Sequence, residues 1–518
     1  MNLALCVLYF AVLALLAAYG FHRLQLVILC RIHRKKLDRM VEQAPPPVVG
    51  DAPSLPRVTI QLPLFNESTV TNRLLDSVAQ MDYPRDKLEI QVLDDSIDET
   101  QAIARAHVER LRAAGIDAVY IHRTDRTGYK AGALDNGLKV AKGDFVAIFD
   151  ADFLPQPDFV RSIIGHFDNP KVAMVQTRWG HMNRDYSILT EVQALMLDGH
   201  HLVENRARCG AGFLFNFSGT GGMWRKSAIA DAGGWQHDTL TEDLDLSYRA
   251  QLKGWQFVYR PDVITPSELP EELSAVRAQQ HRWAKGTVQT TRKLLGRVMR
   301  SDLTITQKIE AFFHFTPHFA YPLLVMLSVL LLPALALNPA ADNETMLMID
   351  LPLLTATTGS LAAFYMEAER AQGRKRRGAA IKLPLLIALG TGLAPHLAKA
   401  VIDGMRNMAG EFVRTPKQGA NKSRYKAKAD LPFAEITLGV LSLLSVVASV
   451  KTGHWFATPF AMLFTAGYSY VAYSIMAEQS NRRRLAVTST SSERPSDAPV
   501  SSVDGGELIA PEVSSPAS

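Results

Sequence analysis

The chain has 518 residues, 47% of them hydrophobic and 21% charged, and a formal net charge of +5 at neutral pH. This length exceeds what one compact core usually holds, so two or more structural units are expected. The small net charge argues against a nucleic-acid-binding protein, whose binding face is strongly basic. Three widely spaced cysteines, Cys6, Cys30 and Cys209, lack metal-ligand spacing and are typical of a reducing compartment.

The amino-terminal segment, residues 1–30, is predicted to be a transmembrane helix. Its apolar run at 3–21 is long enough to cross a hydrocarbon layer of roughly 30 Å. Basic residues follow at 22–36, and by the positive-inside rule they hold this end in the cytoplasm. A cleaved signal peptide would carry its charges before the apolar run, which disfavours that alternative. Residues 31–56 are expected to form a basic, proline-rich linker.

Residues 57–300 are predicted to be a cytoplasmic domain, continued by interfacial helices to residue 318. Short β-branched runs alternate with helical patterns, which indicates an α/β fold with a largely parallel sheet. Ligands of such sheets bind beyond the carboxyl ends of the strands, so polar motifs there are candidate site residues. The expected strands are 58–64, 88–93, 118–122, 145–149, 173–177 and 256–259, with a helix at 67–80.

A second membrane region is predicted over residues 319–477. Segment 383–403 is interrupted by glycine and proline, and a crossing there would strand the basic stretch 406–428 outside. It is therefore expected to be interfacial or re-entrant, which gives five spans in all, with six as the alternative. The low-complexity tail, 478–518, is expected to be disordered and cytoplasmic. The predicted spans of this region are about 319–337, 346–366, 431–450 and 455–476.

Two carboxylate pairs follow predicted strands. Asp94 and Asp95 end the second strand, where acidic groups can accept hydrogen bonds from a ribose or a base. Asp150 and Asp152 end the fourth strand, and carboxylates two residues apart in an extended segment can approach one divalent cation. Each pair has a structural alternative: the first could cap the following helix, and the second could form a solvated turn.

Two further motifs lie nearer the end of the domain. Glu242 and Asp243 offer a carboxylate that could take the proton of an acceptor hydroxyl, or they could merely favour the first turn of a helix. In a QxxRW pattern, Gln279 and Arg282 share a helix face beside Trp283. Arginine can bind a diphosphate and an indole can support a sugar ring, although a buried tryptophan beside a surface arginine would need neither.

Taken together, these motifs resemble those of the cellulose-synthase-like, family-2 glycosyltransferases, particularly the mannan and glucomannan synthase group. The resemblance covers roughly residues 55–300. It implies a GT-A domain, held between transmembrane helices, with an inverting, single-displacement mechanism. A weaker likeness to the gating loop of processive synthases lies at 410–420. The stretches that carry the main resemblance are RTGYKAGAL, VQTRWGHMN, FNFSGTGGMWR, TLTEDLDLSYR, PSELP and QQHRWAKG.

The resemblance also implies roles for individual residues. Asp243 matches the general base, and Asp150 and Asp152 match the pair that contacts the donor and its metal, Mg²⁺ or Mn²⁺. The residues implied in nucleotide-sugar binding are Asp94, Asp95, Lys130, Asp150, Gln279, Arg282 and Trp283. Those implied at the acceptor or in gating are Glu242, Trp283, Phe412, Thr415 and Lys417.

The expected activity is hexose transfer from GDP-mannose or UDP-glucose to a growing β-linked polysaccharide. One alternative is a non-processive lipid glycosyltransferase with a diacylglycerol or ceramide acceptor, and another is an inactive membrane scaffold. The expected partners are the nucleotide-sugar donor, the polysaccharide or lipid acceptor and the bilayer, with no nucleic acid; homodimer formation stays open. The expected location is a bacterial inner membrane, or the Golgi in a eukaryote.

Overall fold

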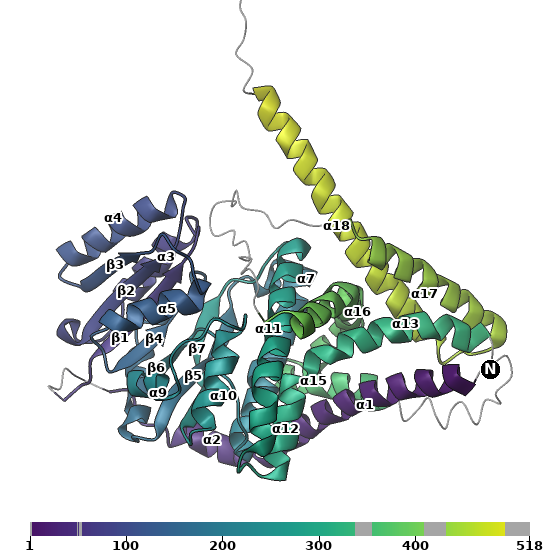
Figure 1. Ribbon diagram of the computed structural model, residues 1–518, viewed down its shortest axis with the longest axis horizontal. Coiled ribbons are helices and arrows are strands. Elements are labelled where there is room, and N and C mark those ends of the chain that lie inside the picture. Colours follow the sequence, from purple (N-terminus) through teal and green to yellow (C-terminus); the bar gives the residue numbers. More distant parts are fainter. Residues whose placement is uncertain (1–2, 49, 51–53, 337–354, 409–430, 493–518) are drawn as a thin grey trace, which may run out of the picture. The chain divides into compact units, whose positions relative to one another are not determined.

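The computed structural model describes residues 3–48, 50, 54–336, 355–408 and 431–492. The chain divides into a compact unit, Met1–Met476, and a second unit, Ala477–Ser518, whose described residues continue the last helix. Within the first unit, a seven-stranded mixed sheet forms one part and long helices form the other (Figure 1).

The sheet has the strand order β3-β2-β1-β4-β6-β5-β7. All paired strands are parallel except β6, which runs antiparallel to β4 and β5. The prediction of an α/β fold with a largely parallel sheet is therefore confirmed. The strands are β1 Val58–Leu64, β2 Leu88–Asp94, β3 Asp117–His122, β4 Phe145–Ile148, β5 Val172–His181, β6 Gly222–Arg225 and β7 Gln256–Ser267.

Helices cover both faces of the sheet, which explains why β1 and β2 are almost entirely buried. Apolar residues of α3 and α4 pack with one face, and those of α5 pack with the other. Buried polar side chains on β1 and β2 pair across the strands, Thr59 with Glu89 at 2.6 Å and Gln61 with Gln91 at 3.0 Å. The helices of this part are α3 Thr71–Ala79, α4 Thr100–Ala113, α5 Tyr129–Val140, α6 Phe159–Ile164, α9 Lys226–Asp231 and α10 Glu242–Gln251.

A group of helices lies between the sheet and the membrane helices (Figure 1). The longest, α11, contacts α10, α12 and α16 and so joins the two parts of the unit. A π-helical turn, η4, interrupts the run from α7 to α8. The bounds are α7 Ile188–Gly199, η4 His200–Glu204, α8 Asn205–Ala211, α11 Leu273–Arg300 and α12 Ile305–Phe315.

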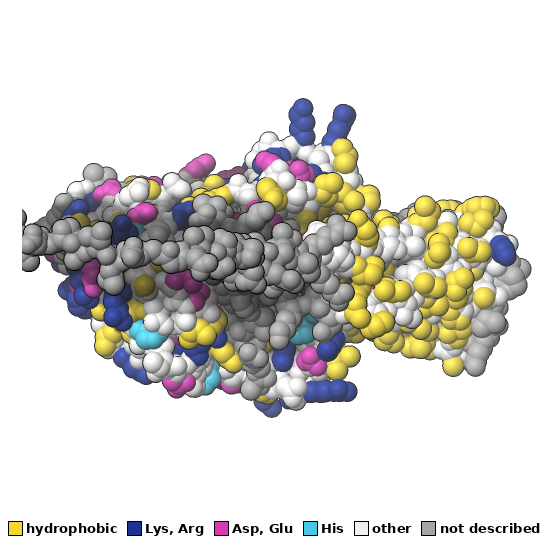
Figure 2. Space-filling model, turned by 90° about the horizontal axis from the view of Figure 1, so that it is seen from above, with side chains coloured by type: hydrophobic (Ala, Val, Ile, Leu, Met, Phe, Trp, Pro, Cys, Tyr) yellow, Lys and Arg dark blue, Asp and Glu magenta, His cyan; other side chains and the backbone are white. Residues whose placement is uncertain are grey.

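Five described helices are long and apolar enough to cross a membrane: Val7–Ile32, Pro317–Ala336, Arg376–Arg406, Phe433–Thr452 and Thr458–Asn481. Figure 2 shows hydrophobic side chains gathered at the end of the molecule where Figure 1 places α1, α13 and α17. Exposed apolar side chains of this kind are expected where lipid is the solvent. The bounds are α1 Leu3–Ile32, α2 Arg34–Glu42, η5 Pro317–Phe319, α13 Ala320–Ala336, η6 Thr355–Gly359, α15 Ser360–Ala371, α16 Arg376–Arg406, α17 Phe433–Thr452 and α18 Thr458–Ser492.

The segment predicted to be interfacial or re-entrant, 383–403, lies inside one continuous helix, α16. One of its glycines is a packing position, because a Cβ added to Gly392 would lie 2.3 Å from the carbonyl oxygen of Gly467 on α18. Whether α16 crosses the bilayer stays a prediction, as does the count of spans. Of the predicted span 346–366, only the part from residue 355 lies within the described residues.

Candidate active site

A pocket of about 100 Å³ lies beyond the carboxyl end of β4, where the loops of the sheet meet α10 and α11. Its polar side chains come from segments that are far apart in the sequence, as expected for a site at the edge of a parallel sheet. The sequence-predicted residues that line it are Lys130, Asp150, Asp152, Glu242, Asp243, Gln279, Arg282 and Trp283.

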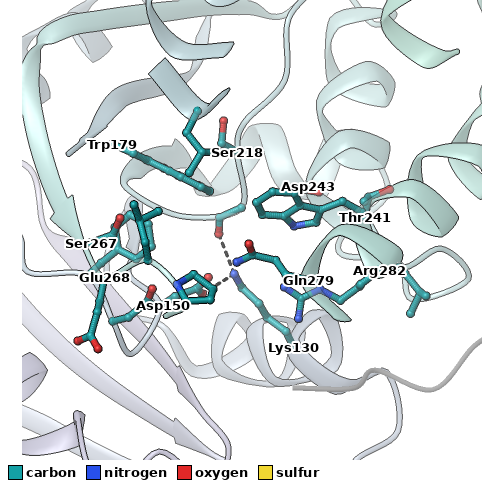
Figure 3. A pocket seen from close by; sticks show the side chains of 18 of the residues that line it. Lys130, Asp150, Trp179, Ser218, Thr241, Asp243, Ser267, Glu268, Gln279 and Arg282 are labelled. Atoms are coloured by element: carbon teal, nitrogen blue, oxygen red, sulfur yellow. Dashed lines mark hydrogen bonds and ion pairs between the residues drawn. The ribbon is translucent and has the colours of Figure 1, made fainter. Parts of the chain in front are cut away.

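Lys130 lies near the start of α5 and reaches across the pocket. Its Nζ donates to Asp150 Oδ1 at 2.5 Å and to the Gly219 carbonyl oxygen at 2.9 Å (Figure 3). Burial lowers the pKa of Lys130, but the charges of Asp150, Glu242 and Asp243 outweigh burial and raise it. The ammonium group is therefore charged and is aimed at the pocket that holds these acids.

Glu242 and Asp243 lie in the first turn of α10, which is the position expected if they merely favour the start of a helix. Both also line the pocket, which helix capping alone does not require. Burial raises the pKa of Glu242. Burial and the neighbouring Glu242 carboxylate raise the pKa of Asp243 to about 7. A carboxyl group with this pKa can exchange a proton near neutral pH.

The QxxRW residues lie on one face of α11, and Gln279, Arg282 and Trp283 all line the pocket. Burial lowers the pKa of the Arg282 guanidinium, although the carboxylates of Glu242 and Asp150 oppose the shift. Figure 3 shows Gln279 and Arg282 facing the part of the pocket that holds Lys130. Two cations from α5 and α11 thus face one space.

Asp94 and Asp95 do not line this pocket. Asp94 accepts hydrogen bonds from the Ser96 backbone N–H at 2.9 Å and from the Tyr120 hydroxyl at 2.6 Å. Asp95 accepts hydrogen bonds from Nε and Nη2 of Arg123, at 2.8 and 2.5 Å. Neither is the cap residue of α4, which is preceded by Glu99.

The Asp94–Asp95 pair and the Asp150–Asp152 pair nevertheless lie at the same edge of the sheet. β2 and β4 both run parallel to β1, so Asp94 and the segment after Ile148 leave the sheet at the same edge, one strand apart. Strands β2 and β4 are therefore about 10 Å apart, a distance that an extended ligand can bridge. Arg123 links the two regions, since it also donates to the Tyr129 carbonyl oxygen at the start of α5.

The carboxylate groups of the pocket suit a hard divalent cation, because carboxylate oxygens are the ligands that such ions prefer. Among the residues described, no group of three or more His, Cys, Asp or Glu side chains could hold a metal ion by itself. Asp150 and Asp152 both line the pocket. Two carboxylates fit a metal that takes its remaining ligands from the phosphates of a bound nucleotide and from water.

The pocket also contains residues for which the sequence predicted no individual role. Trp179, Gly219 and Glu268 belong to the stretches VQTRWGHMN, FNFSGTGGMWR and PSELP, which indicated the family but not the individual residues. Gly219 has a positive φ of 81°, and an added Cβ would lie 3.0 Å from Asp243 Oδ2. The gating-like residues Phe412, Thr415 and Lys417 lie outside the described residues.

A second cavity, of about 270 Å³, adjoins the pocket and is here called the acceptor chamber. Asp243, Gln279, Trp179 and Trp283 line both cavities. The acceptor chamber extends to Leu389 and Leu393 on α16, and further polar groups on its wall are His200, Glu204, Asn216 and His314. It leads from the predicted base toward the apolar helices.

Residues 56–286 match the family described as "Glycosyltransferase like family 2", and the predicted GT-A fold class is confirmed.

The resemblance to the mannan and glucomannan synthase group is also confirmed, by curated relatives. "Glucomannan 4-beta-mannosyltransferase 1" of Oryza sativa subsp. japonica is 42% identical over 296 residues, which are 55% of this chain and 56% of that protein. "Glucomannan 4-beta-mannosyltransferase 2" of Arabidopsis thaliana is 41% identical over 53% of each chain. The chain thus spans about half the length of the curated relatives it matches.

Among solved structures, mannosyltransferase PcManGT from Pyrobaculum calidifontis, in complex with GDP-Man and Mn²⁺, is similar to this chain. The TM-score is 0.44 and the identity 22%, over 75% of this chain and 99% of that one.

Proposed function

We propose that the chain is a membrane-bound, inverting hexosyltransferase that transfers a hexose from GDP-mannose or UDP-glucose to a growing β-linked polysaccharide. The observation that carries the proposal is the convergence of Lys130, Asp150, Asp243 and Arg282 on one pocket. The names of the curated relatives, glucomannan 4-beta-mannosyltransferases, support a mannosyl donor and a β-linked product.

In the proposed reaction, an acceptor hydroxyl oxygen attacks the anomeric carbon of the donor as the bond to the diphosphate oxygen breaks. Asp243 takes the hydroxyl proton, and its pKa of about 7 suits that task near neutral pH. Lys130 and Arg282 face the charge that develops on the leaving nucleoside diphosphate. Attack from the face opposite the leaving group inverts the anomeric configuration.

The nucleotide would extend along the edge of the sheet from the pocket toward Asp94 and Asp95. Asp150 and Asp152 would hold Mg²⁺ or Mn²⁺, which neutralises charge on the diphosphate when bound. Gln279 and Trp283 would position the donor sugar and the acceptor, with Glu242 beside them.

The acceptor would lie in the acceptor chamber. Trp179 and Trp283 present aromatic rings on its wall, and sugar rings stack on such surfaces. Its polar groups His200, Glu204, Asn216 and His314 can exchange hydrogen bonds with sugar hydroxyls. We further propose that the catalytic domain is cytoplasmic, that the amino terminus is outside and that Phe412, Thr415 and Lys417 gate the site.

Incubation of the protein in nanodiscs with GDP-mannose, UDP-glucose and other nucleotide-sugars tests the proposal. We expect nucleotide release with one of the first two donors, and a product that grows in length and is cut by a β-mannanase or β-glucanase. A product of one sugar on an extracted lipid would replace the polymer by the lipid alternative. No nucleotide release with any donor, from folded protein, would favour the inactive scaffold.

A further inference from the structure

A large apolar cavity lies among the membrane helices, apart from the pocket and from the acceptor chamber. Its volume is about 320 Å³, and α1, α13, α15, α16 and the first part of α18 contribute to its wall. Most of the lining side chains are aliphatic or aromatic. Among the described residues that line it, Arg23 is the only charged one.

One stripe of α1 forms a wall along the length of this cavity. Tyr9, Leu13, Leu16, Gly20 and Arg23 all line it, and their spacing of three and four residues places them on one helix face. From the first to the last, the helix rises about 21 Å. That length exceeds the depth of one leaflet, about half of the roughly 30 Å hydrocarbon layer.

Arg23 is the last residue of the stripe and lies at its end nearer in sequence to the basic residues of α2. Counted from Leu3, it is about 30 Å along the helix, a distance equal to the thickness of the hydrocarbon layer. A cation at this depth lies level with the lipid headgroups.

The positive charge of Arg23 has no close carboxylate partner among the described residues. Its guanidinium lies 5.1 Å from the centroid of the Phe364 ring. The acid that acts on it, Glu204, is already paired with Arg208 at 3.2 Å and with His200 at 3.1 Å. The guanidinium also donates a hydrogen bond to the Tyr365 hydroxyl, which lines the same cavity. A guanidinium has five N–H donors, so it can in addition bind an anion that enters the cavity.

We propose that this cavity binds an anionic phospholipid, with an acyl chain along the α1 stripe and the headgroup phosphate at Arg23. The proposal rests on membrane insertion and does not depend on sugar transfer. Met196 and Pro317 line both this cavity and the acceptor chamber, so a bound lipid would support the wall that the two share.

Gly390 allows the cavity to be filled without a clash. It lines the cavity, and an added Cβ would meet no atom within 4 Å. Gly378 lies on the same helix, does not line the cavity and is equally open. Gly390→Leu is therefore the test variant, and Gly378→Leu is its matched control with the same gain in helix propensity.

The experiment is native mass spectrometry of delipidated protein titrated with phosphatidylglycerol or phosphatidylcholine. For the wild type and Gly378→Leu, we expect tighter binding of phosphatidylglycerol than of phosphatidylcholine. Gly390→Leu is expected to lose affinity for phosphatidylglycerol by about ten-fold or more, and Arg23→Gln to bind both lipids alike. Melting temperatures measured in the same detergent establish that each variant is folded.

Equal binding of the two lipids by the wild type would overturn the choice of an anionic headgroup. Unchanged phosphatidylglycerol affinity in folded Gly390→Leu would overturn the cavity as the site. Because no donor is present in these titrations, both results are independent of whether the chain transfers hexose.

Discussion

At the residue scale, the pocket is defined by its balance of charge. Asp150, Asp152, Glu242 and Asp243 face two cations, Lys130 and Arg282. Clustered acids in a buried space repel one another, and this repulsion contributes to the raised pKa of Asp243. A divalent cation would offset the excess of negative charge, and a diphosphate would then meet Lys130 and Arg282.

Replacement of the proposed base, Asp243, should affect the transfer step but not the binding of the donor. Asp243→Asn keeps the carbonyl oxygen that can accept from the Leu244 backbone N–H, a bond of 2.8 Å in the native chain. We expect the transfer rate to fall by about 100- to 10,000-fold, because only proton removal is lost. Donor affinity, measured by calorimetry, should stay within a few-fold of the wild type. Retained turnover would remove Asp243 from the role of base.

The same carboxyl group predicts how activity and stability depend on pH. Transfer should increase as the pH rises through about 7, because the base acts in its deprotonated form. Stability should change in the opposite direction. The folded-state pKa lies above the ordinary value, so the contribution of Asp243 to stability is present at pH 4 and is lost as the pH rises through about 7.

Asp243→Asn should therefore melt at a higher temperature than the wild type at pH 8, with a smaller difference at pH 5. Differential scanning fluorimetry at both pH values measures this. An equal difference at the two values would show that the native carboxyl group does not titrate in this range.

Asp152 is predicted to act through the metal. Asp152→Ala should weaken donor binding by about ten-fold in the presence of Mn²⁺ and leave the metal-free affinity unchanged. Asp168→Ala, at an exposed position at the end of η2 (Gly165–Asp168), is the control and should behave as the wild type. Equal loss of affinity with and without Mn²⁺ would assign Asp152 a metal-independent role.

At the element scale, the position of the Glu242–Asp243 turn depends on how α11 packs against it. A Cβ added to Gly286 would lie 2.7 Å from Thr241 Cγ2 and 2.9 Å from the Leu240 carbonyl carbon. The Gln289 side chain also accepts a hydrogen bond from the Leu240 backbone N–H at 3.0 Å. α11 thus holds both the QxxRW residues and the segment that carries the base.

Gly286→Ala should push this segment out of position. We expect transfer to fall by about a hundred-fold, because a displacement of about 1 Å disrupts the geometry of the reaction. Gly296→Ala on the same helix meets only the flexible end of Arg300, at 3.4 Å, and should keep activity. It should also stabilise the fold by about 0.5–1 kcal/mol. Full activity in Gly286→Ala would show that the neighbouring segment accommodates the added methyl group without disturbing the site.

Elements with a clear periodicity could be predicted from the sequence. The strands β1, β2 and β3 agree with their predicted ranges to within a residue at either end, because they are apolar runs bounded by turn residues. β6 was missed, since a strand of four residues that begins with a glycine has no alternation to detect and the strand is antiparallel. Gly392 resembles a helix break in the sequence, but in the continuous helix α16 it is a packing position.

The site was predictable in part. The motifs named the residues that line the pocket, since carboxylates at strand ends and an i, i+3 pair on a helix have a local geometry that spacing defines. Spacing could not show that Asp94 and Asp95 lie outside the pocket, because that depends on the strand between β2 and β4. It also could not assign Trp179 or Gly219, whose positions depend on contacts far along the chain.

At the scale of the whole molecule, the proposed activity needs the catalytic domain and the donor on the same side of the membrane. Lys139 on α5 is 68% exposed and suits a test of orientation. In a chain whose native cysteines are replaced, Lys139→Cys should react with a membrane-impermeant maleimide only after the cells are permeabilised. Labelling in intact cells would place the catalytic domain outside.

The central claim is that carboxylates and cations from distant stretches of the chain form one donor site. A cryo-electron microscopy structure of the protein in nanodiscs with its donor and Mn²⁺ tests this most directly. The account predicts a diphosphate between Lys130 and Arg282, a metal at Asp150 and Asp152, and a nucleoside that extends toward Asp94. A nucleotide bound elsewhere, or one with Asp243 turned away from the sugar, would contradict it.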